Sequence, residues 1–137
     1  MLKHLLVGYD GSESSRQAFR LAMEMARASK GRVRVVSVVQ VAEGGDTCAL
    51  LMTDSGEQRA RDLLDELKAI DHDAASMVDA EVAFGGPGDV LLSLVKQHQI
   101  DHIVIGHTGR GTLARWLLGS VSDDVLARAH VPVTVVR

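Results

Sequence analysis

The chain has 137 residues, of which 46% are hydrophobic and 24% charged, a composition typical of a globular domain with one core. Its net charge of −3 and its aromatic content of 3% argue against binding of nucleic acid through the phosphate backbone or through stacked bases. The single cysteine, Cys48, excludes an intrachain disulfide, and no apolar run is long enough to span a membrane. We therefore expect one cytoplasmic domain over residues 1–137, with neither nucleic acid nor a membrane as partner.

Patterns typical of strands and helices alternate along the first half of the chain. A continuous apolar run over residues 4–9 predicts a strand buried on both faces. A helix is expected from Ser14 to Ser29, with Ser14 and Gln17 at the spacing of a capping box and Gly31 as the stop. The pattern then predicts a second strand over residues 32–41, a loop of turn residues over 42–56 and a helix over 57–70.

The same alternation continues in the second half. A third strand is predicted over residues 80–84, followed by a helix over 87–98 whose first turn suits Pro87. The remaining predicted elements are a strand over 102–106, a helix over 121–129 and a last strand over 132–136.

This alternation predicts an α/β fold: a doubly wound, five-stranded parallel sheet with helices on both faces. The pattern leaves the strand order open between 2-1-3-4-5 and 3-2-1-4-5. Ligands of such sheets bind at the carboxyl ends of the strands, where the order switches direction. In the 3-2-1-4-5 order, Asp10, Gly11 and Ser12 would face the glycine-rich segment that begins at Gly106.

The segment GHTGRGTLARWLLGS, residues 106–120, contains four glycines. Ser120 and Asp123 have the spacing of a capping box, so a turn and a helix cap would explain part of it. However, the free backbone amides of Gly119, Ser120 and Val121 at a helix N-terminus would also suit an anion. The chemistry therefore favours a phosphate site.

Two common phosphate motifs do not fit this segment. Residues 97–137 contain no lysine, so the Walker loop is absent. Residues 109–114 match the dinucleotide pattern G-x-G-x-x-A, but the acidic residue expected about 20 positions later is missing. A third spacing remains, G-x2-G-x9-G-[ST], formed by Gly106, Gly109, Gly119 and Ser120.

This spacing resembles the nucleotide-binding signature of the universal stress protein family. The resemblance extends over the chain through LLVGYDGSESSRQAFRLAMEMA, the Gly-x-Pro of residues 85–87, DHIVIG and LLGSVSDDVLARAHVPVTVVR. It implies the 3-2-1-4-5 sheet of the adenine nucleotide alpha hydrolase-like or Rossmann-like type. It also implies ATP as the ligand, as in the family's ATP-binding branch, with Mg²⁺ or Mn²⁺ held mainly through the phosphates.

The resemblance also implies which residues meet the nucleotide. Asp10, with Gly11 and Ser12 beside it, would meet the adenosine end, and the backbone at Val38 would contact adenine. The residues expected along the ribose and phosphates are Gly106, His107, Gly109, Arg110, Gly119, Ser120, Val121 and Ser122. Family members commonly form homodimers through the last strand, here Pro132 to Val136.

Each interpretation has an alternative. Asp10, between a strand and a helix, would also suit a simple Asx turn, and Arg110 would also suit a solvated surface. The implied function is that of an ATP-binding sensor or regulatory module in the stress response. The alternatives are a slow ATPase or phosphotransferase using Asp10 or His107, and a nucleotide-free structural dimer. The chain has no nucleophile elbow and no zinc-ligand spacing, so no catalytic residue or protein metal ligand is assigned.

Overall fold

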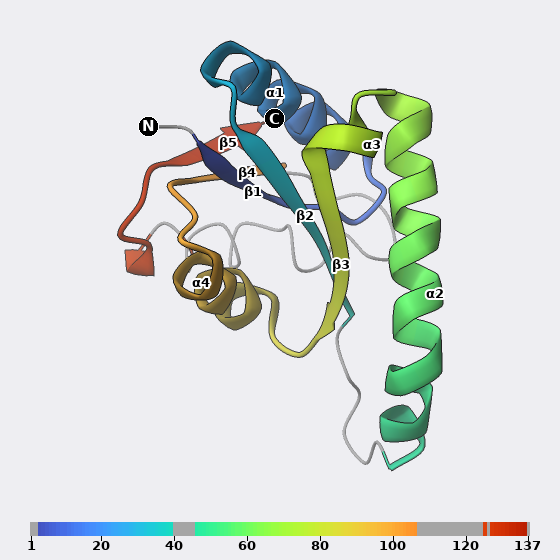
Figure 1. Ribbon diagram of the computed structural model, residues 1–137. Helices are drawn as coiled ribbons and strands as arrows, with labels where there is room; N and C mark the ends of the chain where they lie inside the picture. Colours follow the sequence, from blue (N-terminus) through green and yellow to red (C-terminus); the bar gives the residue numbers. More distant parts are fainter. Residues whose placement is uncertain (1–2, 40–45, 107–124, 126, 137) are drawn as a thin grey trace.

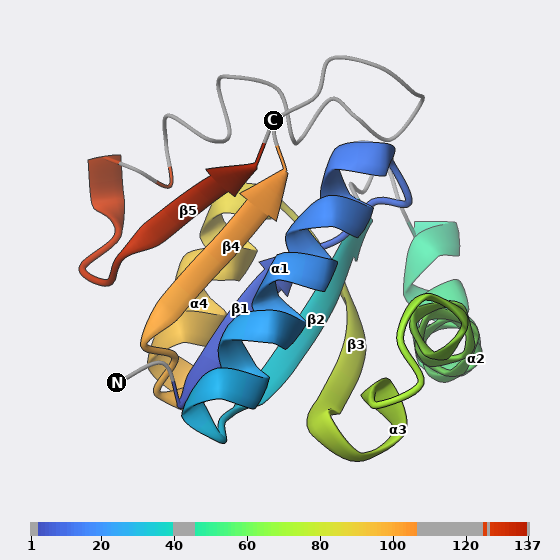
Figure 2. The same ribbon diagram turned by 90° about the horizontal axis from the view of Figure 1, so that it is seen from above.

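The computed structural model describes residues 3–39, 46–106, 125 and 127–136 (Figure 1). Its strands are β1 (His4–Gly8), β2 (Arg32–Val39), β3 (Val78–Phe84), β4 (His102–Gly106) and β5 (Val133–Val136). They form one parallel five-stranded sheet in the order β3-β2-β1-β4-β5, which confirms the predicted order (Figure 2). The sheet therefore switches direction between β1 and β4, where the sequence predicts a ligand site.

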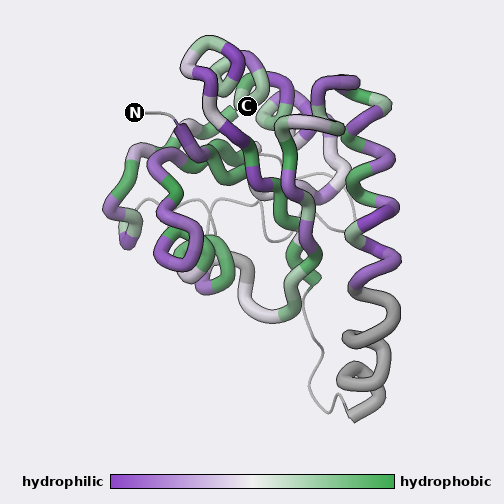
Figure 3. Tube along the Cα trace, viewed as in Figure 1, coloured by the Kyte–Doolittle hydropathy of each residue, from purple (hydrophilic) through white to green (hydrophobic). Residues whose placement is uncertain are grey.

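The helices are α1 (Glu13–Ser29), α2 (Asp46–Ile70), α3 (Ala74–Met77) and α4 (Pro87–His98). Helices α1 and α2 cover one face of the sheet and α4 covers the other, as predicted (Figures 1 and 2). Residues of β1 alternate between the two cores: Leu5 and Val7 pack with α1 and α2, and Leu6 packs with α4. The central strands are correspondingly hydrophobic, and hydrophilic stretches lie along α2 (Figure 3). None of the helices in the described part of the chain is long and apolar enough to cross a membrane.

The first turn of α1 differs from the prediction. The N-cap is Ser12, whose Oγ accepts a hydrogen bond from the backbone N–H of Ser15 at 3.3 Å. The capping box predicted at Ser14 and Gln17 is therefore wrong, because Ser14 is already helical and its side chain is buried. The sequence offers three serines at this junction, and only the geometry of the preceding turn selects the first of them as the cap.

The end of α1 also differs in detail. Lys30 is the C-cap residue and adopts the left-handed conformation, at φ 57° and ψ 40°. Gly31 was predicted to supply this stop, but it follows one residue later and donates its N–H to the carbonyl of Ala26 at 2.8 Å. The end of α4 repeats the pattern, because Gln99 caps it at φ 52°. Two helices thus end on a non-glycine residue in a conformation that favours glycine.

The loop predicted over residues 42–56 is wrong from Asp46 onward, where α2 begins. Glycine, aspartate and serine favoured a loop in the sequence, but residues 49–52 are alanine, leucine and methionine, which are strong helix formers. Once the second half of α2 is anchored by buried Leu63 and Leu67, each residue added at its start contributes one more backbone hydrogen bond.

The other elements lie close to their predicted positions. Strand β3 begins at Val78, two residues before the predicted start, and α4 and β4 have the predicted bounds. Of the helix predicted over residues 121–129, the described residues 125, 127 and 128 are helical. Residues 40–45 and 107–124 lie outside the described part of the chain.

Candidate functional site

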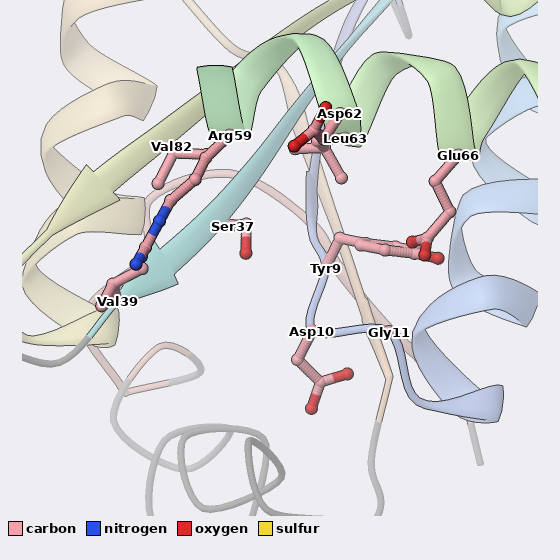
Figure 4. A pocket seen from close by; sticks show the side chains of 10 residues that line it. All are labelled: Tyr9, Asp10, Gly11, Ser37, Val39, Arg59, Asp62, Leu63, Glu66 and Val82. Carbon is pink, nitrogen blue, oxygen red and sulfur yellow. The ribbon is translucent and has the colours of Figure 1, made fainter. Parts of the chain in front are cut away.

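A pocket of about 380 Å³ lies at the carboxyl ends of β1, β2 and β3, where α2 forms its outer wall (Figure 4). It is lined by Tyr9, Asp10, Gly11, Ser37, Val39, Arg59, Asp62, Leu63, Glu66 and Val82. Asp10 and Gly11 were predicted from the sequence to belong to the site. The contribution of α2 to the pocket was not predicted, although its residues Arg59, Asp62 and Glu66 recur at helical spacing beside the buried position Leu63.

The turn between β1 and α1 fixes the position of Asp10. Its Oδ1 accepts a hydrogen bond from the backbone N–H of Ser12 at 2.9 Å, which is the Asx turn weighed from the sequence. Gly11, between them, has φ 84°, in the left-handed region where a side chain is strained. Ser12 in turn caps α1, so both polar residues of this turn are held by local hydrogen bonds.

The second carboxylate oxygen of Asp10, Oδ2, is buried and has no hydrogen-bond partner among the described residues. A buried acceptor without a partner costs about 1–3 kcal/mol, and more when it is charged, so it is rarely left unpaired. The turn therefore explains only one of the two oxygens. The other is available to a donor group on a ligand.

Tyr9 contributes a second buried polar atom to this pocket. Its side chain is only 2% exposed, and its hydroxyl lies between the carboxylate of Glu66 and the guanidinium of Arg16. Burial, together with the carboxylate of Glu66 toward which it points, raises the pKa of Tyr9 to about 12 (Figure 4). The phenol is therefore a neutral hydrogen-bond donor at physiological pH.

The backbone amide and carbonyl of Val38 lie near the end of β2, past the last residue that pairs with β1. Tyr9 donates its N–H to the carbonyl of Val36 at 2.9 Å, and Gly85 donates to that of Val39 at 3.0 Å. Backbone groups alternate in direction along a strand, so those of Val38 point to the β1 side, as those of Val36 do. The ladder between β1 and β2 ends at the pair of Gly8 and Val36. Val38 thus presents its amide and carbonyl beyond the end of β1, while its side chain is buried toward α4.

Gly106, at the end of β4, is required by packing against α1. A Cβ added there would lie 2.6 Å from the carbonyl carbon, 2.7 Å from the oxygen and 2.7 Å from the Oγ of Ser14. The space of the missing side chain is therefore occupied by the first turn of α1. Contact of the Gly106 backbone with a ligand stays a prediction.

The remaining predicted site residues, His107, Gly109, Arg110, Gly119, Ser120, Val121 and Ser122, lie outside the described residues. Among the residues that the structure does describe, no three His, Cys, Asp or Glu side chains are grouped so that they could hold a metal ion.

The charged groups of the pocket are mainly acceptors. Within the described part of the chain, it is lined by three carboxylates, Asp10, Asp62 and Glu66, and by one cation, Arg59. Carboxylates repel phosphate and attract hydroxyl and amino groups. This end of the site therefore suits the donor-bearing part of a ligand, such as a sugar hydroxyl or an exocyclic amine.

Comparison with known proteins places the chain in a family. The chain matches the model of the universal stress protein family over residues 1–137, and it belongs to that family. It is 32% identical over 140 residues to universal stress protein Rv1636 of Mycobacterium tuberculosis, covering 98% of this chain and 96% of that protein. It is 29% identical to universal stress protein MJ0531 of Methanocaldococcus jannaschii, over 100% of this chain and 83% of that one.

Solved structures with the same fold include universal stress protein UspA from Lactobacillus plantarum, with a TM-score of 0.77, 25% identity and coverage of 99% of this chain and 98% of that one. A universal stress protein in complex with cAMP has a TM-score of 0.74 and 27% identity, covering 98% of this chain and 97% of that chain. A universal stress protein from Archaeoglobus fulgidus in complex with dAMP has a TM-score of 0.68 and 25% identity over the full length of both chains.

Proposed function

We propose that this protein binds an adenine nucleotide at the carboxyl edge of its sheet and serves as a nucleotide-dependent sensor or regulatory module in the stress response. The observation that carries the proposal is the buried, unpartnered Oδ2 of Asp10 in a pocket at the end of β1. Relatives solved with cAMP and with dAMP support an adenine nucleotide as the ligand class.

In this proposal, the nucleoside lies over the ends of β1 and β2. Asp10 Oδ2 accepts a hydrogen bond from the nucleoside, and the amide and carbonyl of Val38 meet the edge of adenine. Adenine carries a ring acceptor beside an amino donor, so one backbone N–H and one C=O complement it. The phosphates extend away from the carboxylates of the pocket, toward the segment that follows Gly106.

The ligand that we propose is ATP. His107, Gly109, Arg110 and residues 119–122 would hold its phosphates, with Mg²⁺ or Mn²⁺ bound mainly by phosphate oxygens. A bound metal would supply charge neutralisation between the phosphates. Among the described residues, the groups that suit ATP lie at its adenosine end. They are the buried acceptor oxygen of Asp10 and the backbone N–H and C=O of Val38.

We further propose a cytoplasmic homodimer formed through Pro132 to Val136. Strand β5 is an edge strand whose sequence, VTVV, carries none of the charges that commonly protect such an edge. Val135 lies in this strand, so Val135→Glu should give a monomer in sedimentation at micromolar concentration. A variant that stays dimeric there would contradict this interface.

The binding proposal is tested by Asp10→Asn. Asparagine keeps the oxygen that accepts from the Ser12 N–H, so the Asx turn survives, and it replaces Oδ2 with a donor. Loss of a charged hydrogen bond worth about 1.5–3 kcal/mol predicts a dissociation constant for ATP raised by about 10- to 150-fold in calorimetry.

Asp79→Asn is the matched control, because Asp79 pairs with Arg32 on β2 and does not line the pocket. It should bind ATP like the wild type. A wild-type chain without measurable affinity for adenine nucleotides, or an Asp10→Asn variant with unchanged affinity and unchanged thermal unfolding, would overturn the proposal.

A further inference from the structure

Arg59 is the cation among the described residues of the pocket, and it has no partner among them. It lies on α2, and its side chain extends past Val82 toward Val39 at the end of β2 (Figure 4). No hydrogen bond or ion pair joins its guanidinium to any described residue. An arginine directed into a pocket without an internal partner is available to a ligand.

The carboxylates on the same helix do not compete for Arg59. Asp62 accepts a hydrogen bond from the side-chain amide of Gln58 at 2.9 Å. Glu66, one turn further along α2, points toward the hydroxyl of Tyr9 (Figure 4). The guanidinium is therefore directed at the ends of β2 and β3.

This position lies on the base side of the proposed site. Val39 and Val82, which flank Arg59, belong to β2 and β3, whereas Gly106 ends β4 on the far side of β1. Neighbouring strands are about 4.8 Å apart, so β2 and β3 lie about 10 and 14 Å from β4. The proposed path of the phosphates leads toward β4, away from this guanidinium.

We propose that Arg59 stacks its guanidinium plane on the base of the bound nucleotide and so determines affinity for the nucleoside. This inference rests on the proposed function of the site. A base needs a planar or apolar surface on each face, and arginine serves as such a surface where aromatic side chains are absent. Tyr9 is the single aromatic side chain among the pocket residues that the structure describes, and it is 2% exposed, so little of its ring is open to a ligand. Val39 and Leu63 supply aliphatic surface nearby, and Arg59 supplies the remaining plane.

The test compares Arg59→Ala and Arg59→Lys by calorimetry with two ligands, adenosine and ATP. Stacking requires the guanidinium plane, so lysine should not substitute for arginine. Adenosine already contains the base on which Arg59 stacks, so the phosphates of ATP are not needed for this contact. Both variants should bind both ligands about 2- to 30-fold more weakly, the range that a cation over an aromatic ring contributes. Lys68→Ala, which removes one positive charge from the last turn of α2 outside the pocket, should leave both affinities unchanged.

Two outcomes would overturn the stacking inference while leaving the proposed function intact. The first is a loss confined to ATP and restored by lysine, which indicates a phosphate contact. The second is wild-type affinity in Arg59→Ala. Failure of the wild-type chain to bind either ligand would overturn the proposed function and this inference together. Arg59 is exposed, so all variants should show the thermal unfolding of the wild type.

Discussion

Substitution of Gly106 by alanine tests the packing between β4 and α1. The added methyl would lie 2.6–2.7 Å from three atoms of Ser14, two of which belong to the backbone. A rotamer change of Ser14 relieves only the contact with Oγ, so the first turn of α1 or the end of β4 has to move.

The first turn of α1 resists that movement. Ser12 caps the helix, and its carbonyl also accepts hydrogen bonds from Arg16 N–H at 3.0 Å and from Ser15 Oγ at 2.9 Å. Overpacking of this kind costs about 1–3 kcal/mol. We therefore expect Gly106→Ala to lower the free energy of unfolding in urea by about that amount.

Two further glycines separate a steric cost from a conformational one. Gly86→Ala is the control, because its Cβ would meet the Asp89 carboxylate at 3.4 Å and its φ is −76°; it should change stability by less than about 0.5 kcal/mol. Gly11→Ala meets no atom within 4 Å but has φ 84°, so it should cost about 1–2 kcal/mol through backbone strain alone. If Gly106→Ala unfolds like Gly86→Ala, the close packing on Ser14 is refuted.

Two other predictions concern stability. Lys30→Gly and Gln99→Gly should each raise the free energy of unfolding by up to about 1 kcal/mol, because glycine adopts the left-handed C-cap conformation without strain; lower stability in urea unfolding would contradict this. Burial lowers the pKa of His102, against the opposing effect of Asp101. Because the folded-state pKa of His102 lies below its unfolded value of about 6.5, protonation of the ring favours unfolding. The contribution of His102 to stability is therefore complete above that pH and is lost as the pH falls. In urea unfolding, the free energy of unfolding should therefore fall less between pH 7 and pH 5 in His102→Gln than in the wild type. Equal decreases in the two proteins would exclude this role of the buried ring.

Much of the fold could be predicted because the strands are apolar runs bounded by strong turn signals. β4 and α4 have the predicted bounds, since Pro87 suits the first turn of the helix and residues 102–106 are buried on both faces. The strand order was not contained in the periodicity, because parallel strands of either order carry the same pattern. It followed from the resemblance to the family.

The errors fall where several local solutions are close in free energy. Ser12, Ser14 and Ser15 all favour an N-cap, and the Asx turn of Asp10 decides among them. The start of α2 contains both turn residues and helix formers, and local propensity is a weak prior in such a segment.

The residues that line the pocket were predictable where they directly follow a buried strand and not where the tertiary fold brings them in from a distant helix. Asp10 and Gly11 follow a buried strand, a position that favours a ligand site in parallel sheets. Arg59 and Glu66 reach the pocket from a helix that lies about 50 residues later in the sequence, and their helical spacing beside Leu63 does not by itself distinguish them from solvent-exposed charges. Gly106 was assigned to a ligand from its spacing, whereas its missing side chain is explained by Ser14.

The central proposal, that the chain binds an adenine nucleotide, is tested most directly by releasing the ligand from the purified protein. The wild type, purified without added nucleotide, is denatured, and the supernatant is analysed by chromatography and mass spectrometry. We predict an adenine nucleotide in the wild type and a strongly reduced amount in Asp10→Asn prepared in parallel. A wild-type supernatant free of nucleotide, from protein that also fails to bind added ATP in calorimetry, would contradict the proposal.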